Sequence, residues 1–140
     1  MNRKDLRAST QTERDQYVVR PCDQIPLTQL VEGSFSHLVS TQKATFSFLT
    51  MKAGSQFAVH THPQEQLMIV LEGHCDEIID GAIYPLRKGD IVYLPSNIPH
   101  GAFLNEEDCK ALDIFIGPRE DYMQKYRQQN PTATERFAAR

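Results

Sequence analysis

Short apolar segments separated by turn-forming residues run from Tyr17 to Gly117, and this alternation restricts the possible folds more than any other feature of the chain. Gly, Pro, Asn and Asp interrupt the segments at the intervals typical of β-strands. Asp80-Gly81 is a hairpin-turn signal, and the sequence RKGD (Arg87–Asp90) marks another turn. We expect about seven or eight strands, and strands at this spacing form an all-β sandwich or barrel rather than alternating strand–helix units.

The two ends of the chain differ from this central region. Residues 1–17 are polar and are expected to form a loose N-terminal arm, whereas residues 18–117 are expected to form the barrel. Pro118 begins a segment with acidic residues early and basic residues late, a pattern that predicts one short helix. Residues 118–140 are therefore interpreted as a C-terminal helix followed by a frayed tail. Because no internal repeat is visible, we expect a single barrel.

The composition excludes several classes of partner. A chain of 140 residues with 40% hydrophobic and 24% charged residues is typical of one globular domain. The net charge of −3 gives no electrostatic reason to expect nucleic acid or an anionic membrane as a partner. Leu67–Leu71 is too short to cross a bilayer, and the N-terminus lacks the apolar segment of a secretory signal. Three cysteines without a C-x-x-C pair suggest no disulfide framework, and we expect a cytoplasmic protein.

Two of the five histidines, His60 and His62, lie one residue apart just before a predicted strand. Because residues i and i+2 of a strand point to the same side, the two rings are expected to converge as two metal ligands do. The alternative is chance, since roughly one shuffled chain in seven with five histidines contains such a pair. His100, which follows a proline-containing turn, is the third candidate ligand.

The segment after the histidine pair has two largely apolar faces. Strand periodicity places Gln66, Met68 and Val70 on one face, with the intervening leucines and isoleucine on the other. One face is expected to line the barrel and the other to be covered by a second layer or a partner subunit. We expect a homodimer. Gln66 needs a polar partner at a buried position, either a cation or a water or backbone group.

The order and spacing of these residues resemble the two motifs of the cupin family. The first motif contains a glycine, an H-x-H pair, a glutamate and a second glycine, and the matching positions are Gly54, His60, His62 and Gly73. The second motif is matched by Gly89, Pro95 and His100. This resemblance covers most of the chain and implies a single cupin, or jelly-roll, barrel.

Three positions depart from the cupin pattern. Gln66 stands in place of the motif's glutamate, Asn97 in place of its second-motif glycine, and Leu104 in place of its final asparagine. Asparagine also tolerates a positive φ angle. Three histidines with one glutamine resemble a subset of small cupins, which implies one divalent metal ion (Zn, Ni, Mn or Fe) held by His60, His62, Gln66 and His100. Four neutral ligands would leave the ion its full charge and favour Lewis-acid chemistry.

The segment LDIFIGPREDY contains a second group of candidate residues. Asp113 and Phe115 alternate with apolar neighbours and so share one face, and Arg119 follows a Gly-Pro turn. The segment resembles a closing motif of the KdgF-type pectin-degradation cupins, which implies catalytic roles for Asp113, Phe115 and Arg119. The alternative is a salt bridge of Asp113 with Lys110 and an ordinary helix start. Ile116-Gly117 departs from the small residue and proline common in that group.

Three functional classes follow from these residues. The resemblance implies a metal-dependent, isomerase- or lyase-type enzyme that acts on a small anionic sugar acid, converting a 4,5-unsaturated uronate to its linear 4-deoxy-5-keto form. The second class is an Fe(II)-dependent dioxygenase, because the same ligands with iron support oxygen chemistry. The third is a cupin that binds a sugar acid or metal without catalysis. Oxygen uptake distinguishes the second class from the first, and ligand binding without turnover identifies the third.

Overall fold

Ten strands and three α-helices make up the chain, which a computed structural model describes for residues 1–140. The helices are α1 (Gln11–Tyr17), α2 (Pro21–Gln24) and α3 (Glu120–Gln129), and a short 3-10 turn covers Arg3–Asp5. The strands are β1 (Thr28–Val31), β2 (Ser34–Ser40), β3 (Ala44–Met51), β4 (Gln56–His60), β5 (Glu65–Glu72), β6 (His74–Ile79), β7 (Ala82–Arg87), β8 (Ile91–Leu94), β9 (His100–Phe103) and β10 (Cys109–Ile116).

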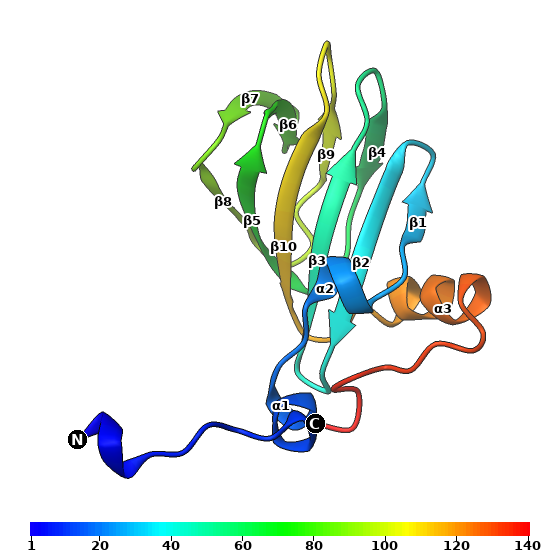
Figure 1. The fold of residues 1–140 in the computed structure, drawn as a ribbon. Coiled ribbons are helices and arrows are strands. Elements are labelled where there is room, and N and C mark those ends of the chain that lie inside the picture. The colour runs from blue at the N-terminus through cyan, green and yellow to red at the C-terminus, as the bar shows by residue number, and fades with distance from the viewer.

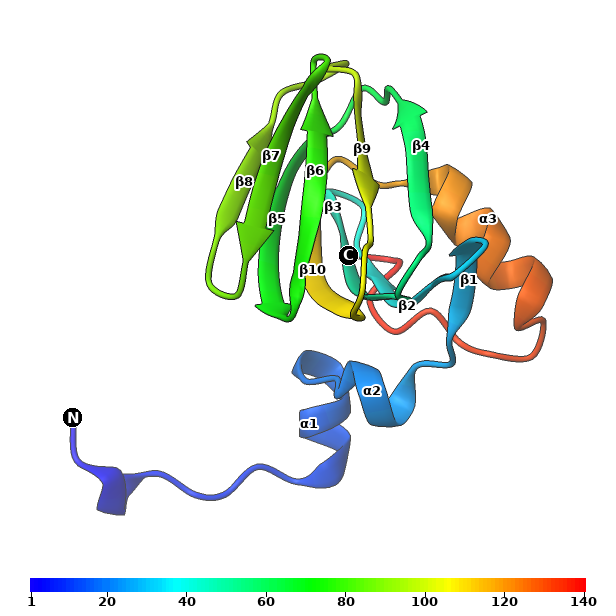
Figure 2. The same ribbon diagram turned by 90° about the horizontal axis from the view of Figure 1, so that it is seen from above.

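The strands form two antiparallel sheets that face each other, as Figure 1 and Figure 2 show from two directions. The larger sheet has the order β1-β2-β3-β10-β5-β8, and the smaller has the order β4-β9-β6-β7. The inward residues of both sheets form one hydrophobic core, to which Val70, Leu94 and Phe115 contribute side chains with at most 1% of their surface exposed. The predicted all-β barrel is therefore confirmed, with more strands than the seven or eight expected.

The turns show why the strands end where they do. Asp80 and Gly81 have φ angles of 48° and 83°, the left-handed pair that a tight two-residue hairpin requires, and they join β6 to β7 as predicted. Asn97 has a φ angle of 63°, so it adopts the conformation that the motif's glycine would otherwise provide. This turn leads directly into β9 and its first residue, His100.

The N-terminal region differs from the expected loose arm. Residues 11–17 are helical because Thr10 and Glu13 form a capping box, in which each side chain accepts a hydrogen bond from the other residue's backbone. None of the residues of α1 is buried, which agrees with the polar composition of this segment. The first strand begins at Thr28, ten residues beyond the start expected for the barrel, because α2 and an irregular segment precede it.

The C-terminal helix α3 lies where Pro118 and the charge pattern predicted it, against β1 and β2. The tail after Asn130 is better ordered than expected. The Tyr126 hydroxyl donates a hydrogen bond to the Thr134 carbonyl, Arg127 pairs with Glu135, and Phe137 packs against the core. These contacts fold the tail back onto the domain. No helix of the structure has the length and apolar character needed to cross a bilayer.

Candidate metal centre

Pairing of β4 with β9 brings the first two histidines together. His60, the last residue of β4, lies directly opposite His100, the first residue of β9, and their ring centroids are 4.4 Å apart. A side chain at Gly101 would collide with β4, because a Cβ atom there would lie 2.6 Å from the Phe57 carbonyl oxygen. The glycine after His100 therefore permits the close approach of the two strands.

His62 reaches the same point by a different route from the one expected. Strand β4 ends at His60, so His62 lies in the following turn rather than on the same strand. Its position is maintained by the backbone N–H of Asn97, which donates to the His62 carbonyl at 2.8 Å. The His60 and His62 rings still converge, with centroids 5.7 Å apart, but a turn and not strand alternation orients the second ring.

Gln66, the second residue of β5, is buried beside His62 as predicted. Its side-chain N–H donates to the Asp113 carboxylate at 2.9 Å, and this bond orients the amide so that the carbonyl oxygen lies 3.1 Å from His62 Nε2. Met68 and Val70 are buried on the same face of β5, while Leu67 and Ile69 are only partly buried on the other. The predicted phase of this strand is confirmed.

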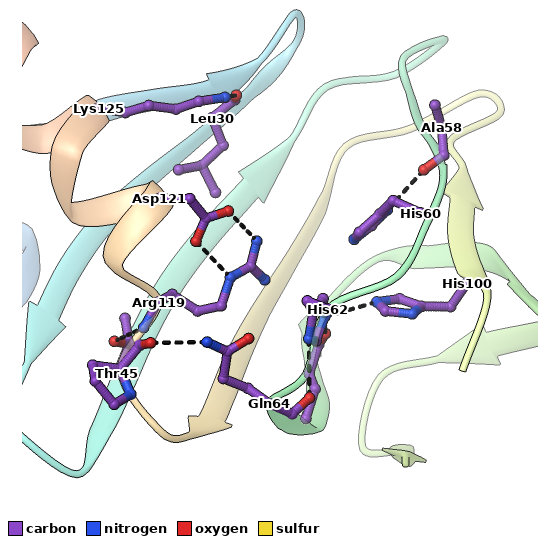
Figure 3. Close-up of polar contacts among 12 residues, drawn as sticks. Leu30, Thr45, Ala58, His60, His62, Gln64, His100, Arg119, Asp121 and Lys125 are labelled. Carbon is purple, nitrogen blue, oxygen red and sulfur yellow. Dashed lines mark hydrogen bonds and ion pairs between the residues drawn. The ribbon is translucent and has the colours of Figure 1, made fainter. Parts of the chain in front are cut away.

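The histidine tautomers follow from the backbone contacts. Nδ1 of His60 and His62 lies 2.8 and 2.9 Å from the carbonyl oxygens of Ala58 and Gln64, respectively (Figure 3). Nδ1 of His100 lies 2.8 Å from the Ile98 carbonyl oxygen. A proton on each Nδ1 satisfies these contacts and leaves each Nε2 as a lone-pair donor. The ligand atoms of the three histidines all lie within 4.8 Å of one another.

Three lone-pair atoms thus face one another without a proton between them. His62 Nε2 lies 3.1 Å from both His100 Nε2 and the Gln66 carbonyl oxygen. Burial lowers the pKa of His62, and it lowers that of His100 to about 4, so both rings are neutral at pH 7. Neutral imidazoles and an amide oxygen that converge in this way suit a divalent cation.

Asp113 and Phe115 both point inward from β10, as strand alternation predicted. Burial raises the pKa of Asp113 to about 6, although the hydrogen bond from Gln66 and the charge of Arg119 favour the ionised form. The Phe115 ring packs edge-on against His62, with centroids 5.5 Å apart. The alternative partner of Asp113 is wrong, because Lys110 pairs instead with Glu72 on the surface.

Arg119 is buried beside the centre, with 4% of its surface exposed. Asp121 accepts two hydrogen bonds from its guanidinium, at 2.9 Å from Nε and 2.8 Å from one terminal nitrogen. The guanidinium also stacks on Tyr122, 3.8 Å from the ring centroid. The other terminal nitrogen, Nη1, has no partner. In Figure 3 the rings of His60 and His100 point toward the side of the view where Arg119 and Asp121 lie.

Two further residues line this cavity that the sequence motifs did not indicate. Glu77 on β6 and Tyr122 on α3 share it with His60, His100, Gln66 and Asp113. Burial raises the pKa of Glu77 to about 8, with the charge of Asp113 as the next contribution, and burial raises that of Tyr122 to about 12. The sequence does contain a signal for Glu77. Alternation along β6 places Glu77 on the same face as the apolar residues Cys75 and Ile79, so a charged residue is expected to point inward there.

The remaining histidines and cysteines lie outside the cavity. His74 pairs with Glu107 on the surface, and the His37 ring contacts the Ile25 carbonyl. Cys75 and Cys109 are completely buried, as expected of small apolar residues.

Comparison of the sequence with known families agrees with this geometry. Residues 47–115 match the family model described as the cupin domain. These residues are a cupin domain. The match extends from β3 to the Phe115 position of β10, so it includes the three clustered histidines, Gln66 and Asp113.

Known cupins and cupin-like proteins resemble the chain over most of the domain. Acireductone dioxygenase from Ciona intestinalis is 34% identical over an alignment of 97 residues. The alignment covers 60% of this chain and 52% of that protein, so the chain spans about half of this relative. The structure of an RmlC-like cupin from Shewanella frigidimarina is 25% identical, with a TM-score of 0.67, and the match covers 71% of this chain and 90% of that one. KdgF from Halomonas sp. is 22% identical, with a TM-score of 0.64 and coverage of 69% and 89%, and shares the fold.

Proposed function

We propose that His60, His62, Gln66 and His100 bind one divalent metal ion. Support comes from the three lone-pair atoms that meet at 3.1 Å with every Nδ1 already committed to a backbone carbonyl. Without a cation, these atoms repel one another in a buried cavity. The bond from Gln66 to Asp113 gives the amide the orientation that a ligand carbonyl needs.

We further propose that this cupin is an enzyme that acts on a small sugar acid. The observation that carries this proposal is the arrangement of Asp113 and Arg119 next to the histidine cluster. Both are buried, one can exchange a proton, and the other has an unpaired N–H donor. Together they suit a substrate with both an acidic carboxylate and an exchangeable proton.

The proposed reaction is the ring opening of a 4,5-unsaturated uronate, to which the KdgF-type resemblance of the DIF and PREDY segments leads. A divalent ion supplies Lewis acidity that stabilises developing negative charge on the substrate oxygens. Arg119 Nη1 binds the substrate carboxylate. Asp113 removes the proton from the C1 hydroxyl as the bond from C1 to the ring oxygen breaks, and it returns a proton to C4. The product is the linear 4-deoxy-5-keto isomer, so no oxidant or reductant is consumed.

The test is metal analysis of the purified protein followed by assay on a panel of unsaturated uronates. We expect about one metal ion per chain and loss of the absorbance of the conjugated double bond. Absence of turnover on every member of the panel, with metal bound, would contradict the proposed reaction. Binding of the acids without turnover would instead identify a non-catalytic sugar-acid-binding cupin.

A dioxygenase is the second candidate, and the 34% identity to acireductone dioxygenase favours it. The same histidines would then hold Fe(II), and dioxygen would be a second substrate. The discriminating measurement is oxygen uptake by iron-loaded protein in the presence of a reactive enolic acid. Uptake in proportion to substrate supports the dioxygenase, whereas turnover of an unsaturated uronate under anaerobic conditions supports the isomerase.

Replacement of Gln66 by glutamate is expected to retain the metal and lower the activity about ten-fold or more. A carboxylate binds the ion but cancels part of its charge. The hydrogen bond that the Gln66 amide donates to Asp113 is also lost. Because a second carboxylate then lies next to Asp113, the pKa of Asp113 rises further. Activity on the anionic substrate and metal content measure the two effects separately. Glu65→Gln, a change at the exposed neighbour, is the control, and wild-type activity of Gln66→Glu would refute the charge argument.

Arg119→Lys is expected to raise the Michaelis constant about ten-fold with a smaller change in turnover number. A lysine lacks the planar guanidinium that pairs with Asp121 and stacks on Tyr122, so the free donor is no longer held in place. The structure modifies the expected role, because Asp121 already occupies two of the guanidinium donors. Steady-state kinetics checks the prediction, and an unchanged Michaelis constant would remove Arg119 from carboxylate binding.

We also propose that a second copy of the chain covers the outer face of the larger sheet. Two apolar rows cross four adjacent strands there, and the residues are Phe48, Leu112, Ile69 and Ile91 in one row and Phe46, Ile114, Leu67 and Tyr93 in the other. Ile91 and Tyr93 are 66% and 56% exposed. Uncovered apolar patches of this kind mark interfaces. Light scattering should give the mass of a dimer, and Ile91→Lys should shift the chain to the monomer.

A further inference from the structure

Glu77 is a buried carboxyl group on the wall opposite Asp113. It lies on β6 in the smaller sheet, whereas Asp113 and Gln66 lie on β10 and β5 in the larger sheet, and all three line one cavity. Only 3% of the Glu77 surface is exposed. Its two strand neighbours are Ala102 on β9 and Tyr84 on β7, so the inward neighbour across β9 offers no polar side chain.

No protein group forms a hydrogen bond with the carboxyl group of Glu77, which lines the cavity. Burial and the repulsion from Asp113 and Cys109 account for its raised pKa, and no hydrogen bond or cation offsets them. The buried cation, Arg119, is paired with Asp121. A carboxyl group in this position needs hydrogen-bond partners, and a ligand bound in the cavity can supply them.

The chemistry of this group specifies what such a ligand must offer. An ionised carboxylate accepts hydrogen bonds from two hydroxyl groups, and a protonated one donates one bond and accepts another. Either form therefore matches a pair of neighbouring hydroxyl groups. A carboxylate or a bare apolar ring does not match it, because the first is repelled and the second leaves the group unpaired.

We propose that Glu77 binds the neighbouring hydroxyl groups of the substrate and so selects a polyhydroxylated acid over an acid without hydroxyl groups. This inference rests on the proposed function, in which Arg119 binds the carboxylate and Asp113 moves the proton. It adds a specificity-determining contact from the smaller sheet. The diol of the substrate then lies at Glu77, across the cavity from Asp113 and Gln66.

The experiment compares two unreactive probes by calorimetry with the metal-containing protein. Galacturonate has a ring oxygen, a carboxylate and ring hydroxyl groups, and tetrahydropyran-2-carboxylate has the same ring and carboxylate without the hydroxyl groups. Wild-type protein is expected to bind galacturonate about ten-fold tighter or more. Glu77→Met keeps the side-chain size and removes the polar group, so the ratio of the two dissociation constants should fall to about one while the bare ring binds as before.

The control is Asp76→Asn, the adjacent residue of β6, whose side chain accepts a hydrogen bond from Asn105 on the outside. It should keep the wild-type ratio, and all variants should keep their metal content. If Glu77→Met fails to fold, Glu77→Gln should lower the ratio because one acceptor oxygen is lost. An unchanged ratio in the folded variant, or a wild-type protein that prefers neither probe, overturns the proposal. Failure of turnover on unsaturated uronates is a separate result, because neither probe has to react.

Discussion

Asp113→Asn is expected to lower the turnover number by a factor on the order of a hundred or more, while the substrate still binds. Asparagine has nearly the size of aspartate, and its carbonyl oxygen can still accept the hydrogen bond that Gln66 donates at 2.9 Å. The cavity is therefore expected to keep its shape. The amide cannot take up or return a proton, so the proposed transfer from C1 to C4 has no carrier.

Two measurements distinguish this loss from a general disturbance. Metal content should remain near one ion per chain, because Gln66 keeps a partner that orients it. The dissociation constant of an unreactive uronate should change by no more than about three-fold, since Arg119 and not Asp113 holds the carboxylate. Wild-type turnover of Asp113→Asn would mean that β10 serves only the structure of the barrel at this position.

His62→Ala is expected to abolish stoichiometric metal binding and, as a result, to lower the activity at least a hundred-fold. His62 is central to the cluster, because its Nε2 lies 3.1 Å from both His100 Nε2 and the Gln66 carbonyl oxygen. Without His62, His100 and Gln66 lose the ligand atom that lies between them. Circular dichroism should remain that of a β-rich fold, because His62 lies in a turn outside both sheets.

The matched control is His74→Ala, which removes a histidine that pairs with Glu107 on the surface. Elemental analysis should find the wild-type metal content in this variant. Full metal occupancy of His62→Ala would exclude the cluster as the metal site, whatever the activity. Loss of metal from both variants would point instead to a general loss of folded protein, which circular dichroism reveals.

Strand periodicity was the most informative sequence feature for the fold and part of the site. Because side chains alternate along a strand, the inward positions of Gln66, Asp113 and Phe115 followed from their neighbours. The Asp80-Gly81 hairpin followed from turn chemistry in the same way. His62 was placed correctly for the wrong reason, since the strand ends before it and a tertiary bond from Asn97 positions it.

Features that depend on contacts between distant segments were not predictable. The alternation of Cys75, Glu77 and Ile79 indicates that Glu77 points inward, but its place in the cavity depends on the pairing of β6 with β9. Arg119 and Asp121 are only two residues apart in the sequence. Even so, the sequence does not show whether the Arg119 guanidinium donates its hydrogen bonds to Asp121 or to a ligand. The C-terminal tail folds back because Arg127 meets Glu135, a contact between two loosely patterned segments.

The two faces of strand β10 have different roles. Its inward residues, including Asp113 and Phe115, serve the cavity, and its outward residues Leu112 and Ile114 belong to the apolar rows on the other side of the sheet. Insertion of one residue near Cys109 would exchange the two sets, placing the carboxylate on the outer surface and an isoleucine beside the histidines. Length changes in this strand should therefore be eliminated during evolution, whereas substitutions that preserve its parity can alter catalysis or assembly one at a time.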